Sequence, residues 1–132
     1  MSKSDYLENR MLDHVLGGPT YNRRPTVYVS LHTASVGDDG LGAEVSGGGY
    51  TRASVANNST NWPAAVSGMK TNGTLIQFVA ATAAWGTVTY FGIWDGVTGG
   101  NLLRWGVLGV PQIIQSGDAP YFEPGYLICM EY

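Results

Sequence analysis

The sequence predicts a mainly β protein, an antiparallel β-sandwich of the jelly-roll or immunoglobulin-like kind preceded by one short N-terminal helix. Three observations support this. Apolar and polar side chains alternate along most of the chain after residue 26. Glycines number 19 in 132 residues, about twice their usual share. Strand-like segments recur at spacings of roughly 8 to 12 residues, as in sandwiches. We expect a docking helix at residues 1–18 and one β-sandwich domain at residues 19–132.

The helix is predicted over residues 4–16. Ser4 can cap its first turn, and the Gly-Gly-Pro sequence that follows the helix ends it. Leu7, Met11 and Val15 recur every four residues, so they form one apolar stripe. Because a helix this short is marginally stable alone in water, the stripe is expected to dock on the chain's own sheet or on a neighbouring subunit. We therefore predict that these three residues serve assembly.

The first strand is predicted at residues 26–32, where valine and leucine alternate with polar residues. The glycine-rich stretch 34–49 that follows is predicted to be a long loop, or a loop around a short edge pairing at Glu44 and Val45. It has few large apolar side chains to offset the entropy of ordering its backbone. We expect contact with a neighbouring subunit to order it. Tyr50 then opens the next strand and is predicted to be an anchor.

The most informative segment is a predicted β-hairpin within residues 85–106. Its strands are rich in aromatic residues, which suits a surface covered by a second sheet or a neighbouring subunit. Phe91 and Trp94 are expected on opposite faces of one strand, because side chains alternate along a strand. Trp85, Phe91, Trp94 and Trp105 are predicted to be structural or assembly residues.

Further strands are predicted on both sides of this hairpin. Residues 74–80 form one, with Ile76 and Phe78 on the same face. Residues 111–115 are expected to form a separate edge strand, because the proline at its start cannot donate to a ladder. The last strands are expected within residues 121–130.

Composition excludes several classes of function. The formal net charge is −3 and the basic residues are scattered, so no nucleic-acid partner is expected. The apolar runs are too short for a membrane helix. The polar N-terminus does not resemble a signal peptide, so we expect synthesis in a cytoplasm without export by that route.

Few residues suggest chemistry. His14 and His32 are expected to be ordinary surface or hydrogen-bonded histidines, and their spacing does not match a zinc motif. Asp38, Asp39 and Glu44 share a loop that could gather calcium ligands, but the spacing does not match a helix-loop-helix site, and a solvated loop is favoured. We predict no enzyme, metal or cofactor. One alternative stays open: the three tryptophans of the hairpin segment could form a stacking platform for a sugar.

Several segments resemble a family of small bacteriophage virion proteins usually labelled tail fibre proteins. The segments are LHTA at 31–34, EVSGGGYTR at 44–52, WGTVTYFGIWD at 85–95 and GGNLL at 99–103. The resemblance extends to the N-terminal helix and the closing strands, so it covers nearly the whole chain. None of these segments is a catalytic motif.

The resemblance implies a non-enzymatic structural protein of the virion, either a surface decoration or a tail-fibre-type component. Its expected partners are other virion proteins, of the capsid or tail, and copies of itself. Two alternatives remain: a cement protein that stabilises the capsid, and a receptor-binding module that recognises host glycan.

Overall fold

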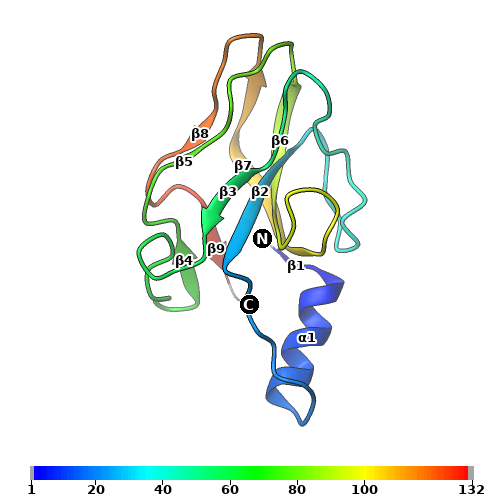
Figure 1. The fold of residues 1–132 in the computed structure, drawn as a ribbon, viewed down its shortest axis with the longest axis vertical. Helices are drawn as coiled ribbons and strands as arrows, with labels where there is room; N and C mark the ends of the chain where they lie inside the picture. Colours follow the sequence, from blue (N-terminus) through cyan, green and yellow to red (C-terminus); the bar gives the residue numbers. More distant parts are fainter. Residues whose placement is uncertain (1, 131–132) are drawn as a thin grey trace.

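The computed structural model describes residues 2–130 and confirms a mainly β fold with antiparallel sheets and a short N-terminal helix (Figure 1). In chain order, the elements are β1 (Ser2–Lys3), α1 (Asp5–Val15), β2 (Thr26–His32), β3 (Ala53–Ala56), β4 (Met69–Thr71), β5 (Ile76–Gln77), β6 (Gly86–Trp94), β7 (Leu102–Ile114), β8 (Tyr121–Phe122) and β9 (Ile128–Met130).

Five strands form the main sheet, in the order β1-β7-β6-β2-β3. The second layer consists of two separate two-stranded ribbons, β4-β9 and β5-β8. The ribbons lie to the left of the main sheet in Figure 1. The predicted hairpin is β6 and β7, which pair from Gly86↔Ile114 at one end to Trp94↔Leu102 at the other.

The main core lies between the sheet and the ribbons. Phe91 and Ile93 of β6 belong to it, and Phe78 and Phe122 cover them from the β5-β8 ribbon. The rings of Phe91 and Phe122 meet edge to face, with centroids 6.0 Å apart, an arrangement that aromatic pairs prefer. Trp94 faces the other side of the sheet, in a smaller cluster. The predicted placement of Phe91 and Trp94 on opposite faces is therefore confirmed.

The helix is held at its first turn. Ser4 caps it, because its hydroxyl accepts a hydrogen bond from the Leu7 N–H at 3.1 Å and donates another to the Leu102 carbonyl. Leu7 is buried in the main core. Met11 is half-buried, whereas Val15 at the far end is 71% exposed. Only the first half of the predicted stripe therefore packs on the chain's own core.

One expectation from the sequence needs correction, and it concerns the strand expected at residues 111–115. It is the continuation of β7, which runs through Pro111. The proline lies in a bulge, because the register shifts between Val88↔Gln112 and Tyr90↔Val107. A bulge leaves residues out of the ladder, so the missing proline N–H costs no ladder bond.

The loop at residues 34–49, for which the sequence predicts ordering by a neighbouring subunit, also makes contacts within its own chain. Val36 and Val45 are buried. The Asp38 carboxylate accepts hydrogen bonds from the Trp105 indole at 2.8 Å and the Ser2 hydroxyl at 2.9 Å. Polar contacts with distant elements thus supplement the limited apolar burial of the loop.

Candidate assembly site

The segments that carry the family resemblance meet in a buried network around Arg52, just before β3. The Arg52 guanidinium forms two hydrogen bonds with Glu44, at 2.9 and 2.8 Å. It donates two more, each 2.8 Å long, to the carbonyls of Gly96 and Gly99. It also lies over the Trp94 ring, 3.9 Å from the centroid. One side chain thereby ties the loop before β3 to the turn of the β6-β7 hairpin.

Tyr50 and Trp85 extend this network. The Tyr50 hydroxyl donates to Glu44 at 2.6 Å and accepts from the Leu31 N–H at 3.1 Å. Its ring meets the Trp85 ring edge to face at 5.3 Å, and the Trp85 indole donates to the Gly48 carbonyl at 2.9 Å. Burial, followed by the bond to Glu44, raises the pKa of Tyr50. Both residues hold the glycine-rich turn in place.

Glu44 remains a carboxylate within this network. Burial alone would raise its pKa, but the hydrogen bonds from Arg52 and Tyr50 outweigh burial and lower the pKa below its usual value. The buried arginine therefore faces a charged partner. Glu44 and the carbonyls of Gly96 and Gly99 together satisfy most of the hydrogen-bond donors of Arg52.

A second chain of hydrogen bonds crosses β2. The Trp94 indole donates to the Ser30 hydroxyl at 2.7 Å, and that hydroxyl lies 2.6 Å from His32 Nε2. His32 Nδ1 lies 2.6 Å from the Gly42 carbonyl, which can only accept, so Nδ1 carries a proton. The neutral ring then accepts from Ser30 at Nε2, and burial lowers the pKa of His32 accordingly.

Ser30 and His32 are in hydrogen-bond contact, as a catalytic nucleophile and its base would be, but this contact is their only likeness to such a pair. Both side chains are fully buried, and the Ser30 hydroxyl is occupied by Trp94 and His32. A substrate cannot reach this serine without opening the core. The pair serves to position β2 and the loop that follows it.

The other residues that suggested chemistry are dispersed. Tyr21 donates its backbone N–H to His14 Nδ1 at 3.0 Å. Asp38 binds Trp105, and Glu44 binds Arg52. Within residues 2–130, no group of three or more histidines, cysteines, aspartates or glutamates could hold a metal ion.

The tryptophans do not form the stacking platform that the sequence left open. Trp85 and Trp94 are only 5% and 7% exposed. Trp105 is half-buried against Tyr90, with ring centroids 6.0 Å apart. A sugar ring would find no common exposed surface across these indoles.

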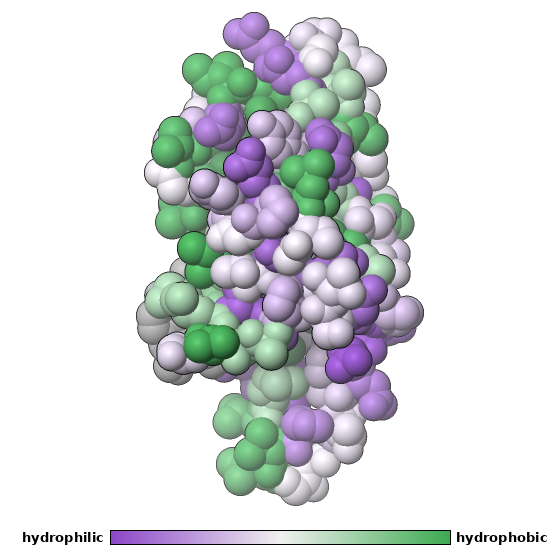
Figure 2. Space-filling model, turned by 90° about the vertical axis from the view of Figure 1, so that its left-hand side faces the viewer, coloured by the Kyte–Doolittle hydropathy of each residue, from purple (hydrophilic) through white to green (hydrophobic). Residues whose placement is uncertain are grey.

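Several apolar surfaces remain uncovered in residues 2–130, and two of them are large. The first, here called the α1 tip, consists of Leu12, Val15 and Leu16, which are 61%, 71% and 76% exposed. It lies at the bottom of the molecule, where Figure 2 shows hydrophobic side chains over the end of the helix.

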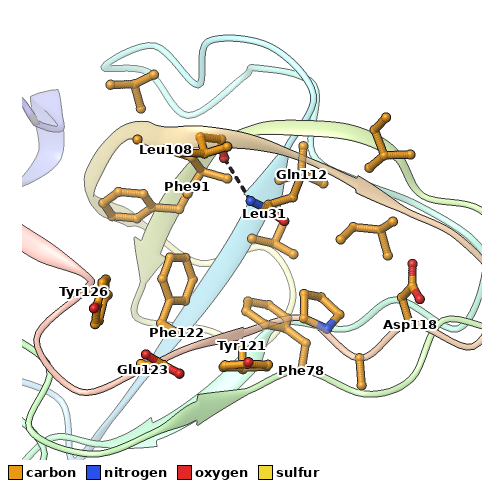
Figure 3. Close-up of a pocket in the computed structure, with 18 of the residues that line it drawn as sticks. Leu31, Phe78, Phe91, Leu108, Gln112, Asp118, Tyr121, Phe122, Glu123 and Tyr126 are labelled. Atoms are coloured by element: carbon orange, nitrogen blue, oxygen red, sulfur yellow. Dashed lines mark hydrogen bonds between the residues drawn. The ribbon is translucent and has the colours of Figure 1, made fainter.

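The second uncovered surface, here called the β7 groove, is a hollow of about 850 Å³ between β7 and residues 118–126. Phe91 and Leu31 lie at its base, and Ile113 and Tyr121 are exposed at its borders. Figure 3 shows Leu108 on one side of the groove and Tyr121 on the other. The groove exists because the β5-β8 ribbon leaves this part of β7 uncovered.

A mainly β domain whose motif residues build an internal network, and whose apolar side chains stay exposed at several surfaces, has the features of a structural component that assembles with others. Comparison with protein families specifies the class. Residues 2–129 match the family described as Podophage GP4 fiber I protein gp80, so the chain belongs to this phage fibre family and is a virion component. A search of curated proteins gives no match. Within residues 2–130, no helix is long and apolar enough to cross a membrane.

The structure places the eight predicted residues in different settings. Leu7, Phe91 and Trp85 belong to the main core, and Trp94 to the smaller cluster. Met11, Tyr50 and Trp105 are half-buried, and Val15 is exposed. Sequence reasoning missed Arg52 and Ser30 as members of the network, because charged and hydroxyl side chains are usually at the surface. The signal for Arg52 was its place within the EVSGGGYTR segment.

Proposed function

We propose that the chain is a non-enzymatic structural subunit at the virion surface, a decoration or tail-fibre-type component, that joins other virion proteins and copies of itself through α1. One observation carries the proposal. The helix is anchored at Ser4 and Leu7, yet it presents the α1 tip to solvent. Several large apolar side chains together at a protruding helix end favour burial against a partner.

The free energy of burying the α1 tip indicates how strongly the helix contributes to association. Burying a large aliphatic side chain yields about 1.5–3 kcal/mol, so the three side chains of the α1 tip supply roughly 5–9 kcal/mol. Association costs an estimated 4–15 kcal/mol in lost freedom of motion. The α1 tip alone would therefore bind weakly, and stable incorporation needs a second contact.

Within residues 2–130, the side chains that suggested chemistry are buried or bonded to one another, and this supports the non-enzymatic part of the proposal. Arg52, Glu44 and Tyr50 satisfy one another inside the domain. Ser30 and His32 are sealed in the core. Each polar side chain of the network has a role in holding loops, and that role accounts for its burial.

The test is incorporation into phage particles. A variant carrying Leu12→Ser, Val15→Ser and Leu16→Ser is expressed during infection by a phage that lacks the natural chain, and purified particles are assayed for it by mass spectrometry. We expect incorporation to be lost with the melting temperature unchanged, because all three side chains are exposed. Leu41→Ser is the matched control, since Leu41 is 85% exposed on a loop outside the helix.

Normal incorporation of the triple variant would overturn the proposal. Deleting residues 1–18 is not an equivalent test, because it removes β1 from the sheet and Leu7 from the core. Imaging of labelled particles then distinguishes a fibre or tail position from a cement on the capsid. A glycan array tests the receptor-binding alternative on the same protein.

A further inference from the structure

We propose that a pocket between α1 and the β4-β9 ribbon binds an anionic amphiphile, that is, one aliphatic chain that ends in a carboxylate or a phosphate. The pocket, here called the ribbon pocket, has a volume of about 630 Å³ and is lined by residues that include Leu7, Met11, Trp62, Lys70 and Arg104. Small-molecule sites typically have about 300–1,000 Å³. In Figure 1, α1 and the ribbon flank the lower end of β2. The inference goes beyond the proposed function, because the α1 tip does not line this pocket.

The floor of the ribbon pocket is apolar. Leu7, Ile93 and Leu103 line it and belong to the main core, where each is less than a tenth exposed. Met11 of α1 and Met130 of β9 also line the pocket. Methionine is unbranched and flexible, so it adapts to a bound group of irregular shape. An aliphatic chain would find apolar contacts along this floor.

The charged side chains of the lining are cationic. Arg23, Lys70 and Arg104 line the pocket, and within residues 2–130 no aspartate or glutamate does. Lys70 is half-buried and Arg23 is exposed. In that part of the chain, neither of these two has a hydrogen bond or an ion pair. A half-buried ammonium has lost part of its hydration, so an anion in the pocket would supply the partner that Lys70 lacks there.

The acidic residues of neighbouring elements do not cancel this charge. Successive residues of a helix are rotated by about 100°, and two residues of α1 line the pocket. Glu8 and Arg10 therefore lie on the two flanks of this lining face and carry opposite charges, whereas Asp5 and Asp13 lie on the far side. Asp95 acts electrostatically on one lining residue, and two arginines oppose it there.

Hydrogen-bond donors outnumber acceptors among the polar side chains of the lining. Lysine, arginine and the tryptophan indole carry donors and no acceptor. The Trp62 indole N–H is the one buried side-chain polar group of residues 2–130 without a hydrogen-bond partner, and a ligand oxygen that reached its ring edge would supply one. A peptide would bring N–H donors that need acceptors of their own. A carboxylate or phosphate brings oxygen acceptors, which match this lining.

The first experiment measures laurate binding to the full chain by isothermal titration calorimetry, at concentrations below those at which laurate forms micelles. Dodecyltrimethylammonium is the matched control ligand, because its chain has the same length and its charge is positive. We expect one laurate bound per chain, and binding of the cation weaker by a factor of about ten or more.

Three variants locate the site. Lys70→Gln removes the half-buried charge and should weaken laurate binding about fivefold, as the loss of a partly exposed ion pair does. Ala65→Glu adds a carboxylate at an exposed position of the lining and should abolish binding. Arg24→Gln is the matched control, because it removes a positive charge outside the lining, and binding should stay within about twofold. Thermal melting checks that each variant folds.

A second measurement reports position and does not depend on charge. Laurate that carries bromine on its chain quenches the fluorescence of tryptophans that it contacts. Trp62→Phe should remove most of this quenching, because the other tryptophans lie outside the lining. The substitution also deletes the indole N–H that has no partner in residues 2–130.

Flotation with phosphatidylglycerol vesicles distinguishes the sources of such a ligand. Association that is lost in Lys70→Gln would assign the site to a lipid within a bilayer, whereas laurate binding without vesicle association would assign it to a free amphiphile. Four results would overturn the inference: no binding of laurate, equal binding of laurate and the cation, undiminished binding to Lys70→Gln or Ala65→Glu, and quenching that persists in Trp62→Phe. Each leaves the particle-incorporation test unaffected, because the variants of that test lie outside the ribbon pocket.

Discussion

Replacing Arg52 by methionine removes the centre of the buried network while keeping a side chain of similar length. The Arg52 side chain is 6% exposed and that of Glu44 is 25% exposed, so solvent screens their ion pair only partly. Breaking a buried ion pair typically costs about 3–5 kcal/mol, because the remaining charge is left without its partner. The partial exposure of Glu44 points to the lower end, about 3 kcal/mol. For a domain of this size, that loss lowers the Tm by roughly 10 °C.

Urea unfolding followed by tryptophan fluorescence measures the free energy of unfolding. Arg24→Met is the matched control, since the Arg24 side chain is exposed, and we expect its effect to stay within about 0.5 kcal/mol. Adding Glu44→Gln to Arg52→Met should recover part of the loss, because the unpaired charge disappears. A loss below about 1 kcal/mol for Arg52→Met would show that the pair behaves like a surface ion pair. Arg52 would then not be the residue that holds the loop before β3 to the turn of the hairpin.

The remaining predictions concern pH, the core and the glycine-rich turn. The pKa of His32 is lowered from 6.5 in the folded protein, so the unfolded chain takes up a proton first as pH falls. The urea midpoint of unfolding should therefore drop between pH 7.5 and pH 5.5. Equal midpoints at the two pH values would contradict a buried neutral imidazole. Phe91→Ala should cost about 3–5 kcal/mol by urea unfolding, whereas Val107→Ala on the exposed side of β7 should cost little; similar losses would refute the assigned faces. Gly47→Ala should cost about 1–2 kcal/mol for its positive φ alone. Gly48→Ala should lower the Tm further, because its Cβ would also lie 2.9 Å from a carbonyl and an indole ring; equal shifts would mean that the turn relaxes freely.

Alternation along strands made the hairpin predictable from sequence. Phe91 and Trp94 are three residues apart. Because successive side chains of a strand point to opposite faces, the two residues were predicted on opposite faces without knowledge of the neighbouring strands. The same holds for Ile76 and Phe78, both buried, which flank the exposed Gln77. Local signals also predicted the helix, because its cap at Ser4 depends on residues within one turn.

Features that depend on distant contacts could not be predicted in this way. The burial of Arg52 requires Glu44, Gly96 and Gly99 to converge, and no local pattern reports that. The contact of Asp38, in the loop at residues 34–49, with Trp105 could not be predicted either, because the two residues are remote in sequence. The bulge in β7 could not be predicted either, so the sequence indicated two strands where the structure has one.

The pairing of β1 with β7 has a consequence for the order of events during synthesis. The Ser4 hydroxyl that caps α1 also bonds to a carbonyl 98 residues further along the chain. At a translation rate of about 5–20 residues per second, that partner emerges roughly 5–20 s later. Until then the start of the chain has no sheet to join, and Leu7 has no completed core to enter. We therefore expect the helix to dock late, once the β6-β7 hairpin exists, so that subunits become competent to assemble only after the central sheet has formed.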